Sequence, residues 1–132
     1  MTIFERINII AAIIAALSFS SVVAKFITKR YRKKSCLFFE KVDIVLMKIH
    51  KPAAIILIVS GTLHGTLSII NFYDFGIIPN ILGTIGLLSC IASTAIFYVK
   101  KRLKIPKLWI FHHRFYAAVA LVALIGHIVA SI

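Results

Sequence analysis

Four long apolar runs dominate the pattern of hydrophobic and polar positions along this 132-residue chain. Each run is long enough to cross a bilayer as a helix, which takes about 20 residues. We therefore predict an all-α integral membrane protein with one transmembrane domain over residues 1–132. The predicted four-transmembrane-helix bundle has helices at about residues 7–26, 52–72, 77–99 and 108–132. The first run is interpreted as a retained helix, because its removal as a signal would export the basic segment that follows.

A shorter helical pattern precedes Pro52. Its apolar residues recur every three or four positions, and its charged residues lie largely between them. This pattern predicts either an interfacial helix over residues 37–50 or a cytoplasmic extension of the second helix that bends at the proline. Pro52, Pro79 and Pro106 are each expected near the start of a helix, where a missing amide hydrogen costs least.

Composition agrees with a membrane location. Hydrophobic residues make up 61% of the chain and charged residues only 15%, which leaves too little polar surface to coat a soluble globule. Sixteen Lys and Arg residues outnumber four Asp and Glu residues, for a net charge of +12. The bases concentrate in residues 25–51 and 100–107, and residues 71–80 contain none. By the positive-inside rule, the two basic loops are cytoplasmic and both termini face outward, an N-out/C-out topology.

The same distribution argues against nucleic acid as a partner, because the bases lie in loops between apolar runs without interleaved aromatic residues. Membrane lipid is the expected surrounding, and anionic headgroups would satisfy the basic loops. We therefore predict a multi-pass protein of a prokaryotic cytoplasmic membrane.

Five histidines carry the candidate chemistry, and all lie in or at the ends of the second and fourth predicted helices. His50 and His64 form a His-x13-His pattern, and so do His113 and His127. Over this spacing a helix rises about 21 Å and falls roughly 40° short of four full turns, so each pair lies on one helix face at two depths. Because the two helices run in the same direction, His50 is expected opposite His113 near the cytoplasm, and His64 opposite His127 near the outside.

Two opposed imidazoles at each of two depths match the ligand set of two non-covalent, bis-histidine b-type haems. Zinc fits less well because it takes four clustered ligands, and c-type attachment would need a CxxCH motif that the sequence lacks. Lys51 and Arg114 are candidates to pair with propionates of the inner haem, although topology alone would also explain them. Gly61, Gly65 and Gly126 would let a haem approach the backbone, although close helix packing would also explain them.

His112 competes with His113 as the haem ligand. Neighbouring helical residues are about 100° apart, so at most one of the two shares the face of His127. His113 is preferred as the ligand, with His112 at the interface or near a propionate, and the reverse assignment stays open. A stripe of small residues typical of close helix packing also runs along the third helix, at Gly83, Gly86, Cys90 and Ser93.

The two His-x13-His pairs resemble the transmembrane core of the ferric reductase-like superfamily, which includes ferric reductases and NADPH oxidases. In that family, two helices separated by one other helix each carry two such histidines, and together they hold two stacked b haems. The resemblance covers roughly residues 47–132 and depends almost wholly on the four histidines. It implies electron transfer from a cytoplasmic-side donor, through the inner and then the outer haem, to ferric iron, oxygen or a quinone at the outer face.

Many family members carry a cytoplasmic flavin and nicotinamide domain, for which this chain has no room. The resemblance therefore implies an oxidoreductase that acts with a separate flavoprotein or ferredoxin-like donor, which the basic inner face would steer. The pattern is also similar to cytochrome b561-like four-helix cytochromes, for which the donor would be a quinol.

Two other functions remain open. One is a non-catalytic membrane anchor or assembly subunit of a larger redox complex, whose helices only pack against a partner. The other is a metal-ion transporter with a histidine relay. A transporter would be expected to have acids near the histidines, and the predicted helices 52–72, 77–99 and 108–132 contain none.

Overall fold

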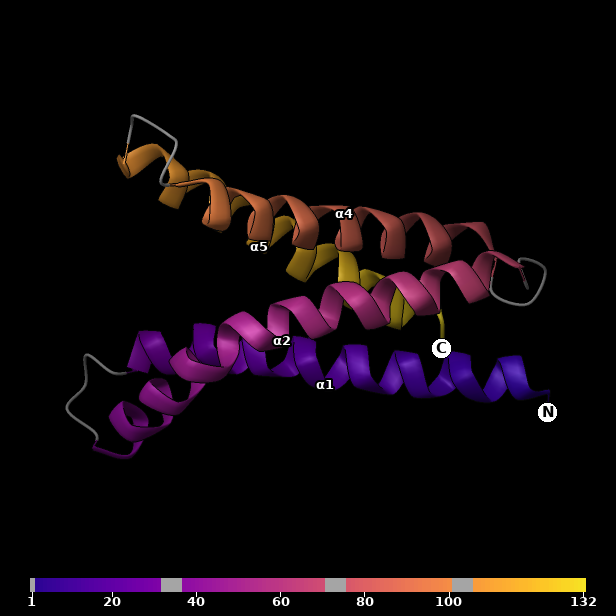
Figure 1. Ribbon diagram of the computed structural model, residues 1–132, viewed down its shortest axis with the longest axis horizontal. Coiled ribbons are helices and arrows are strands. Elements are labelled where there is room, and N and C mark those ends of the chain that lie inside the picture. The colour runs from indigo at the N-terminus through magenta and orange to yellow at the C-terminus, as the bar shows by residue number, and fades with distance from the viewer. Residues whose placement is uncertain (1, 32–36, 71–75, 101–105) are drawn as a thin grey trace. The chain divides into compact units, whose positions relative to one another are not determined.

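The computed structural model describes residues 2–31, 37–70, 76–100 and 106–132. Four helices account for nearly all of them, and no strand occurs among these residues. The helices are α1 (Ile3–Tyr31), α2 (Leu37–Ile70), α4 (Ile77–Val99) and α5 (Pro106–Ala130) (Figure 1). Each is long and apolar enough to cross a membrane. The prediction of an all-α membrane protein with four membrane-spanning helices is therefore confirmed.

Local sequence explains how three of the helices begin. At the start of α1, Thr2 and Glu5 form a capping box: the Thr2 amide donates to Glu5 Oε2 at 2.7 Å, and the Glu5 amide donates to Thr2 Oγ1 at 3.2 Å. Helix α4 follows Gly76, whose φ of 76° lies in a region that glycine alone enters easily. Helix α5 begins at Pro106, where the missing amide hydrogen leaves no helical bond unmade.

Helix α2 contains both residues 37–50 and most of the second predicted transmembrane span, whose connection the sequence did not determine. It runs without a break from Leu37 to Ile70, so residues 37–50 extend the second helix rather than form a separate interfacial helix. Pro52 therefore lies inside a helix and not at its start, and it has no amide hydrogen for the carbonyl of Lys48. The register of buried positions continues across the proline, from Leu46 to Ala53. The same helix face is therefore buried on both sides of the proline.

The chain divides into two compact units, residues 1–61 and residues 62–132. The first contains α1 and most of α2. The second contains the last turns of α2 together with α4 and α5. Within this second unit, α4 and α5 lie side by side as an antiparallel pair (Figure 1). Gly86 of α4 is buried against Leu124 of α5 in this pair.

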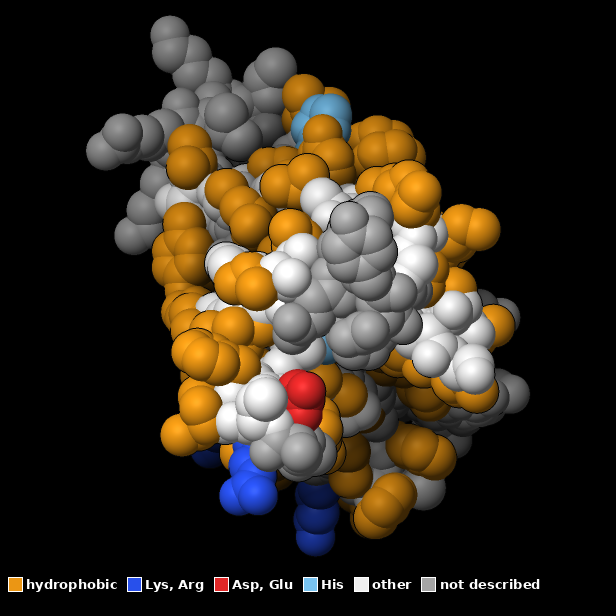
Figure 2. Space-filling view, turned by 90° about the vertical axis from the view of Figure 1, so that its right-hand side faces the viewer, with side chains coloured by type: hydrophobic (Ala, Val, Ile, Leu, Met, Phe, Trp, Pro, Cys, Tyr) orange, Lys and Arg blue, Asp and Glu red, His pale blue; other side chains and the backbone are white. Residues whose placement is uncertain are grey.

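Apolar side chains point outward from all four helices. Exposed large residues include Ile10, Val59, Ile78 and Val122, and hydrophobic side chains cover much of the face in Figure 2. Hydroxyl groups bond back to the main chain of their own helix, as Ser60 does to the carbonyl of Ile56 at 2.7 Å. A surface of this kind is suited to contact with membrane lipid. The basic residues at 32–34 and 101–104, which belong to the two predicted cytoplasmic loops, lie outside the described residues.

Candidate functional site

The two histidines of α2 lie on its least exposed face. His50 is four residues after buried Leu46 and three before buried Ala53, and His64 lies four residues from buried Ser60 and from buried Ser68. Spacings of three and four keep residues on one side of a helix. Both imidazoles are half-buried, and the Nδ1 atom of His50 is buried. The predicted common face of His50 and His64 therefore coincides with the buried stripe of α2.

Helix α5 has the same arrangement. His113 and His127 are both half-buried, and buried Ala120 and Ala123 lie between them at helical spacing. His112, by contrast, is exposed, and its ring contacts the ring of its exposed neighbour Phe111. Of the two adjacent histidines, His113 is thus the one on the side of α5 that packs against α4.

His127 contacts the first turns of α4. Its Nδ1 atom lies 2.8 Å from the main-chain oxygen of Pro79. The ring also passes close to Gly83, where a Cβ atom would lie 3.0 Å from Nδ1 and 3.2 Å from Cε1 of His127. A side chain at position 83 would force the imidazole to move. Glycine in this place therefore permits the hydrogen bond to the carbonyl of Pro79.

His64 approaches His127 from the last turns of α2. The two ring centroids are 6.0 Å apart, and the ring planes make an angle of 74°. Both residues belong to the second compact unit. The structure thus brings together one of the two predicted pairs. His50 belongs to the first unit, and its pairing with His113 stays a prediction.

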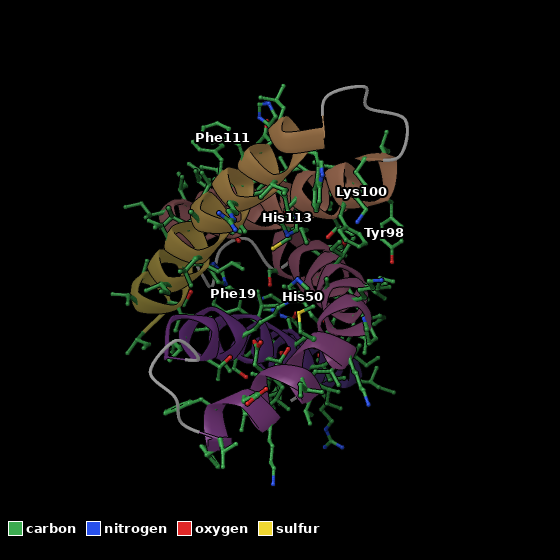
Figure 3. All side chains as sticks on the ribbon, turned by 90° about the vertical axis from the view of Figure 1, so that its left-hand side faces the viewer. Phe19, His50, Tyr98, Lys100, Phe111 and His113 are labelled. Carbon is green, nitrogen blue, oxygen red and sulfur yellow. The ribbon has the colours of Figure 1, made fainter. Side chains whose placement is uncertain are left out.

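His113 contacts α4 near the other end of the hairpin (Figure 3). Its Nδ1 atom lies 2.9 Å from the main-chain oxygen of Ser93 and 2.9 Å from the Ser93 hydroxyl oxygen. The Ser93 hydroxyl also donates to the main-chain oxygen of His113 at 3.2 Å. Ser93 is 6% exposed, so these bonds are shielded from solvent.

The hydrogen-bond partners determine which nitrogen of each ring carries a proton. A carbonyl oxygen can only accept, so Nδ1 must be the donor in both His113 and His127. In a neutral imidazole the other nitrogen, Nε2, then holds the lone pair. A histidine that donates Nδ1–H to a main-chain carbonyl and presents Nε2 is the usual form of a metal ligand.

The contacts of His127 with Pro79 and of His113 with Ser93 have the same spacing along both helices. The acceptor residues Pro79 and Ser93 are separated along α4 by the same number of positions as their partners along α5, His113 and His127. Because the helices are antiparallel, this equal spacing lets each histidine meet a main-chain carbonyl at its own depth. In both α5 imidazoles, Nδ1 is therefore the atom that donates to α4.

An aromatic cluster surrounds His113 at the open end of the hairpin. The rings of Phe97 and Trp109 lie 6.3 and 6.2 Å from the ring of His113. The ammonium group of Lys100 lies over both rings, 4.1 Å from the centroid of Phe97 and 4.6 Å from that of Trp109. Such cation–π contacts hold a lysine at the boundary between apolar and polar surroundings. Figure 3 shows Lys100 beside Tyr98 at this end of α4.

The remaining predicted site residues have different surroundings. Lys51 and Arg114 are exposed. Gly61 and Gly65 are half-buried in α2, and a Cβ atom at Gly65 would meet nothing within 4 Å. Gly126 packs against α4, since a Cβ atom there would lie 3.3 Å from Leu82. This last glycine is thus engaged in helix packing, whereas Gly65 has open space next to His64.

Three features of the site escaped sequence reasoning. The main-chain oxygen of Pro79 has no signature in the side-chain pattern. Gly83 and Ser93 were noticed only as small residues, although each contacts a histidine. Outside the site, Asp43 belongs to the segment 37–50 that the sequence placed before the second transmembrane helix; it lies within α2 and is 4% exposed.

Among the described residues, no group of three or more His, Cys, Asp and Glu side chains could hold a metal ion. A haem needs fewer protein ligands than a bare metal ion, because its macrocycle supplies four nitrogens and the protein supplies only the axial ligands. Comparisons with family models, with curated proteins and with solved structures found no match for this chain. The functional argument therefore depends on the geometry of the histidines.

Proposed function

We propose that this protein transfers electrons across a membrane through two b haems, each held by one histidine of α2 and one of α5. The proposed outer site uses His64 and His127, and the proposed inner site uses His50 and His113. An electron would enter from a cytoplasmic flavoprotein, a ferredoxin-like protein or a quinol. It would leave from the outer face to ferric iron, oxygen or a quinone.

The approach of His64 to His127 is the observation that carries the proposal. One imidazole from each of two helices would hold a haem iron between them, and this pair comes from α2 and α5. The centroids of His64 and His127 are 6.0 Å apart. The bond from His127 to Pro79 adds support, because with Nδ1 as the donor the Nε2 atom would be the one to hold a metal.

The inner site is supported by repetition. His50 and His64 share the buried stripe of α2 in the His-x13-His pattern. His113 and His127 share the α4-facing side of α5 at the same spacing, and both donate Nδ1–H to a carbonyl of α4. Two pairs with equal spacing suit two haems stacked along the bundle axis.

Absorption spectroscopy tests this function. The protein is purified after expression with haem supply, and reduced-minus-oxidised spectra and pyridine haemochrome stoichiometry are recorded. We expect low-spin b bands and about two haems per chain. His64→Ala and His113→Ala should each lose one haem or convert it to high spin. The matched control is His112→Ala, which removes the exposed neighbour of His113 and should keep both haems.

Other outcomes would decide among the remaining functions. Folded protein without haem would refute electron transfer through haem, and it would favour an anchor subunit or a metal-ion transporter. One haem per chain, lost in His64→Ala but kept in His113→Ala, would restrict the function to the outer pair. Loss of a haem in His112→Ala instead of His113→Ala would reverse the assignment of the α5 ligand.

A further inference from the structure

We propose that Ser93 is a positioning residue, which holds the His113 imidazole by a second acceptor and makes His113 a stronger donor to a metal than His127. The part that concerns the metal rests on the proposed haem function. The part that concerns the imidazole rests on the hydrogen bonds between α4 and α5 alone.

One proton assignment satisfies all three bonds between Ser93 and His113. The main-chain oxygen of Ser93 requires a proton on Nδ1, so Nδ1 has no lone pair to accept with. The Ser93 hydroxyl oxygen, also 2.9 Å from Nδ1, must then accept the same proton. Its own proton is left to donate to the main-chain oxygen of His113 at 3.2 Å. Ser93 thus accepts from the ring of His113 while donating to its backbone.

His127 provides a comparison within the same hairpin. The residue that corresponds to Ser93 in the repeated contact along α4 is Pro79, which also offers its main-chain oxygen. A proline side chain has no acceptor, so this position cannot supply a second bond. The two α5 histidines therefore differ by one hydroxyl group. Each ring donates to a carbonyl, and among the residues that the structure describes His113 alone also donates to a side chain.

The second hydrogen bond of His113 should increase the electron density at its Nε2 atom. Donation from Nδ1–H shifts the imidazole toward imidazolate and makes the opposite nitrogen a better ligand. A more basic axial ligand favours the oxidised metal and lowers its reduction potential. Loss of the Ser93 hydroxyl should therefore raise the midpoint potential of the metal on His113. The metal on His127 should not respond.

The first measurement uses protein without haem. We would record ¹⁵N and ¹H NMR signals of the histidine side chains in lipid nanodiscs, assigned with His113→Ala and His127→Ala. Wild type should show Nδ1–H for both residues. In Ser93→Ala, the Nδ1–H signal of His113 should move upfield and that of His127 should not move. In Ser93→Thr, which keeps the hydroxyl, the His113 signal should return to its wild-type position. Ser89→Ala is the matched control, because Ser89 is 7% exposed and lies one turn away on α4.

The second measurement uses the haem-loaded protein. Redox titration of Ser93→Ala should show one midpoint raised and the other unchanged, with low-spin spectra and haem content as in wild type. Unchanged potentials together with an unchanged His113 signal would overturn the inference, as would equal shifts at both haems. Protein that binds no haem would refute the proposed function, and the NMR comparison would still decide whether Ser93 positions His113.

Discussion

At the scale of single residues, the contact between His127 and Gly83 sets the position of an imidazole against the backbone of α4. A Cβ atom at position 83 would lie 3.0 Å from Nδ1 of His127, closer than the ring can accept without moving. Gly65 is the opposite case, because a Cβ atom there would meet nothing within 4 Å. Both glycines lie within helices, where alanine is favoured by about 1 kcal/mol.

Alanine substitution of these two glycines should therefore have different effects. In protein without haem, Gly65→Ala should stabilise the fold by about 0.5–1 kcal/mol. Gly83→Ala should gain nothing or lose about 1 kcal/mol, because displacement of the imidazole weakens its bond to Pro79. Equilibrium unfolding in detergent measures both changes.

The double variant Gly83→Ala/His127→Ala provides the control. Once the imidazole is gone, alanine at position 83 should become favourable by about the helix-propensity difference of 1 kcal/mol. Equal effects of Gly83→Ala in the presence and absence of His127 would show that the ring does not approach this position.

At the scale of elements, the α4–α5 hairpin is the unit that organises the site. Its small residues let the helices approach, and Gly86 makes the tightest of these contacts: a Cβ atom would lie 2.7 Å from both Cγ and Cδ2 of Leu124. No histidine takes part in the contact between Gly86 and Leu124. A substitution there therefore tests the packing of the hairpin separately from the proposed chemistry. Close approach in turn brings Ser93 within hydrogen-bonding distance of His113.

Gly86→Ala should loosen this packing. The added methyl group must displace Leu124, and overpacking of this kind costs about 1–3 kcal/mol, offset in part by the better helix propensity of alanine. Thermal unfolding should therefore show a lower midpoint for Gly86→Ala than for wild type. Adding Leu124→Ala should remove the clash and recover part of the loss, and a midpoint unchanged in Gly86→Ala would contradict the close approach.

At the scale of the whole molecule, the apolar helices and the distribution of charge predict how the chain crosses a membrane. All four helices are long and apolar enough to cross a membrane, and large hydrophobic residues are exposed along them. If all four helices cross the membrane, the chain returns to the side on which it began, and both termini lie on one side. The concentration of bases in residues 25–51 and 100–107 predicts that this side is the outside.

Cysteine labelling tests this orientation. In a background with Cys36→Ser and Cys90→Ser, single cysteines are placed at three exposed positions, Ile3, Lys48 and Ile132. A membrane-impermeant maleimide added to intact cells should label positions 3 and 132, and position 48 only after permeabilisation. The reverse pattern would show that the termini face the cytoplasm, and labelling of all three in intact cells would contradict four complete spans.

The sequence by itself determined the number of membrane-spanning helices and the matched spacing of the histidines. Both are local properties: the length of an apolar run and the angle between residues on one helix need no knowledge of a neighbour. The sequence did not determine the extent of α2, because Pro52 predicts a helix start as readily as an interruption. In the structure α2 continues through Pro52, and the same face is buried on both sides of it.

Tertiary structure decided which atoms of the histidines are engaged. Whether His112 or His113 faces α4, which ring nitrogen carries the proton, and why Gly83 and Ser93 matter all depend on the register between two antiparallel helices. That register is set by close contacts such as Gly86 with Leu124, between residues far apart in the sequence. Spacing within one helix cannot reveal it, because a hydrogen bond to a main-chain carbonyl requires a position in space and no particular side chain.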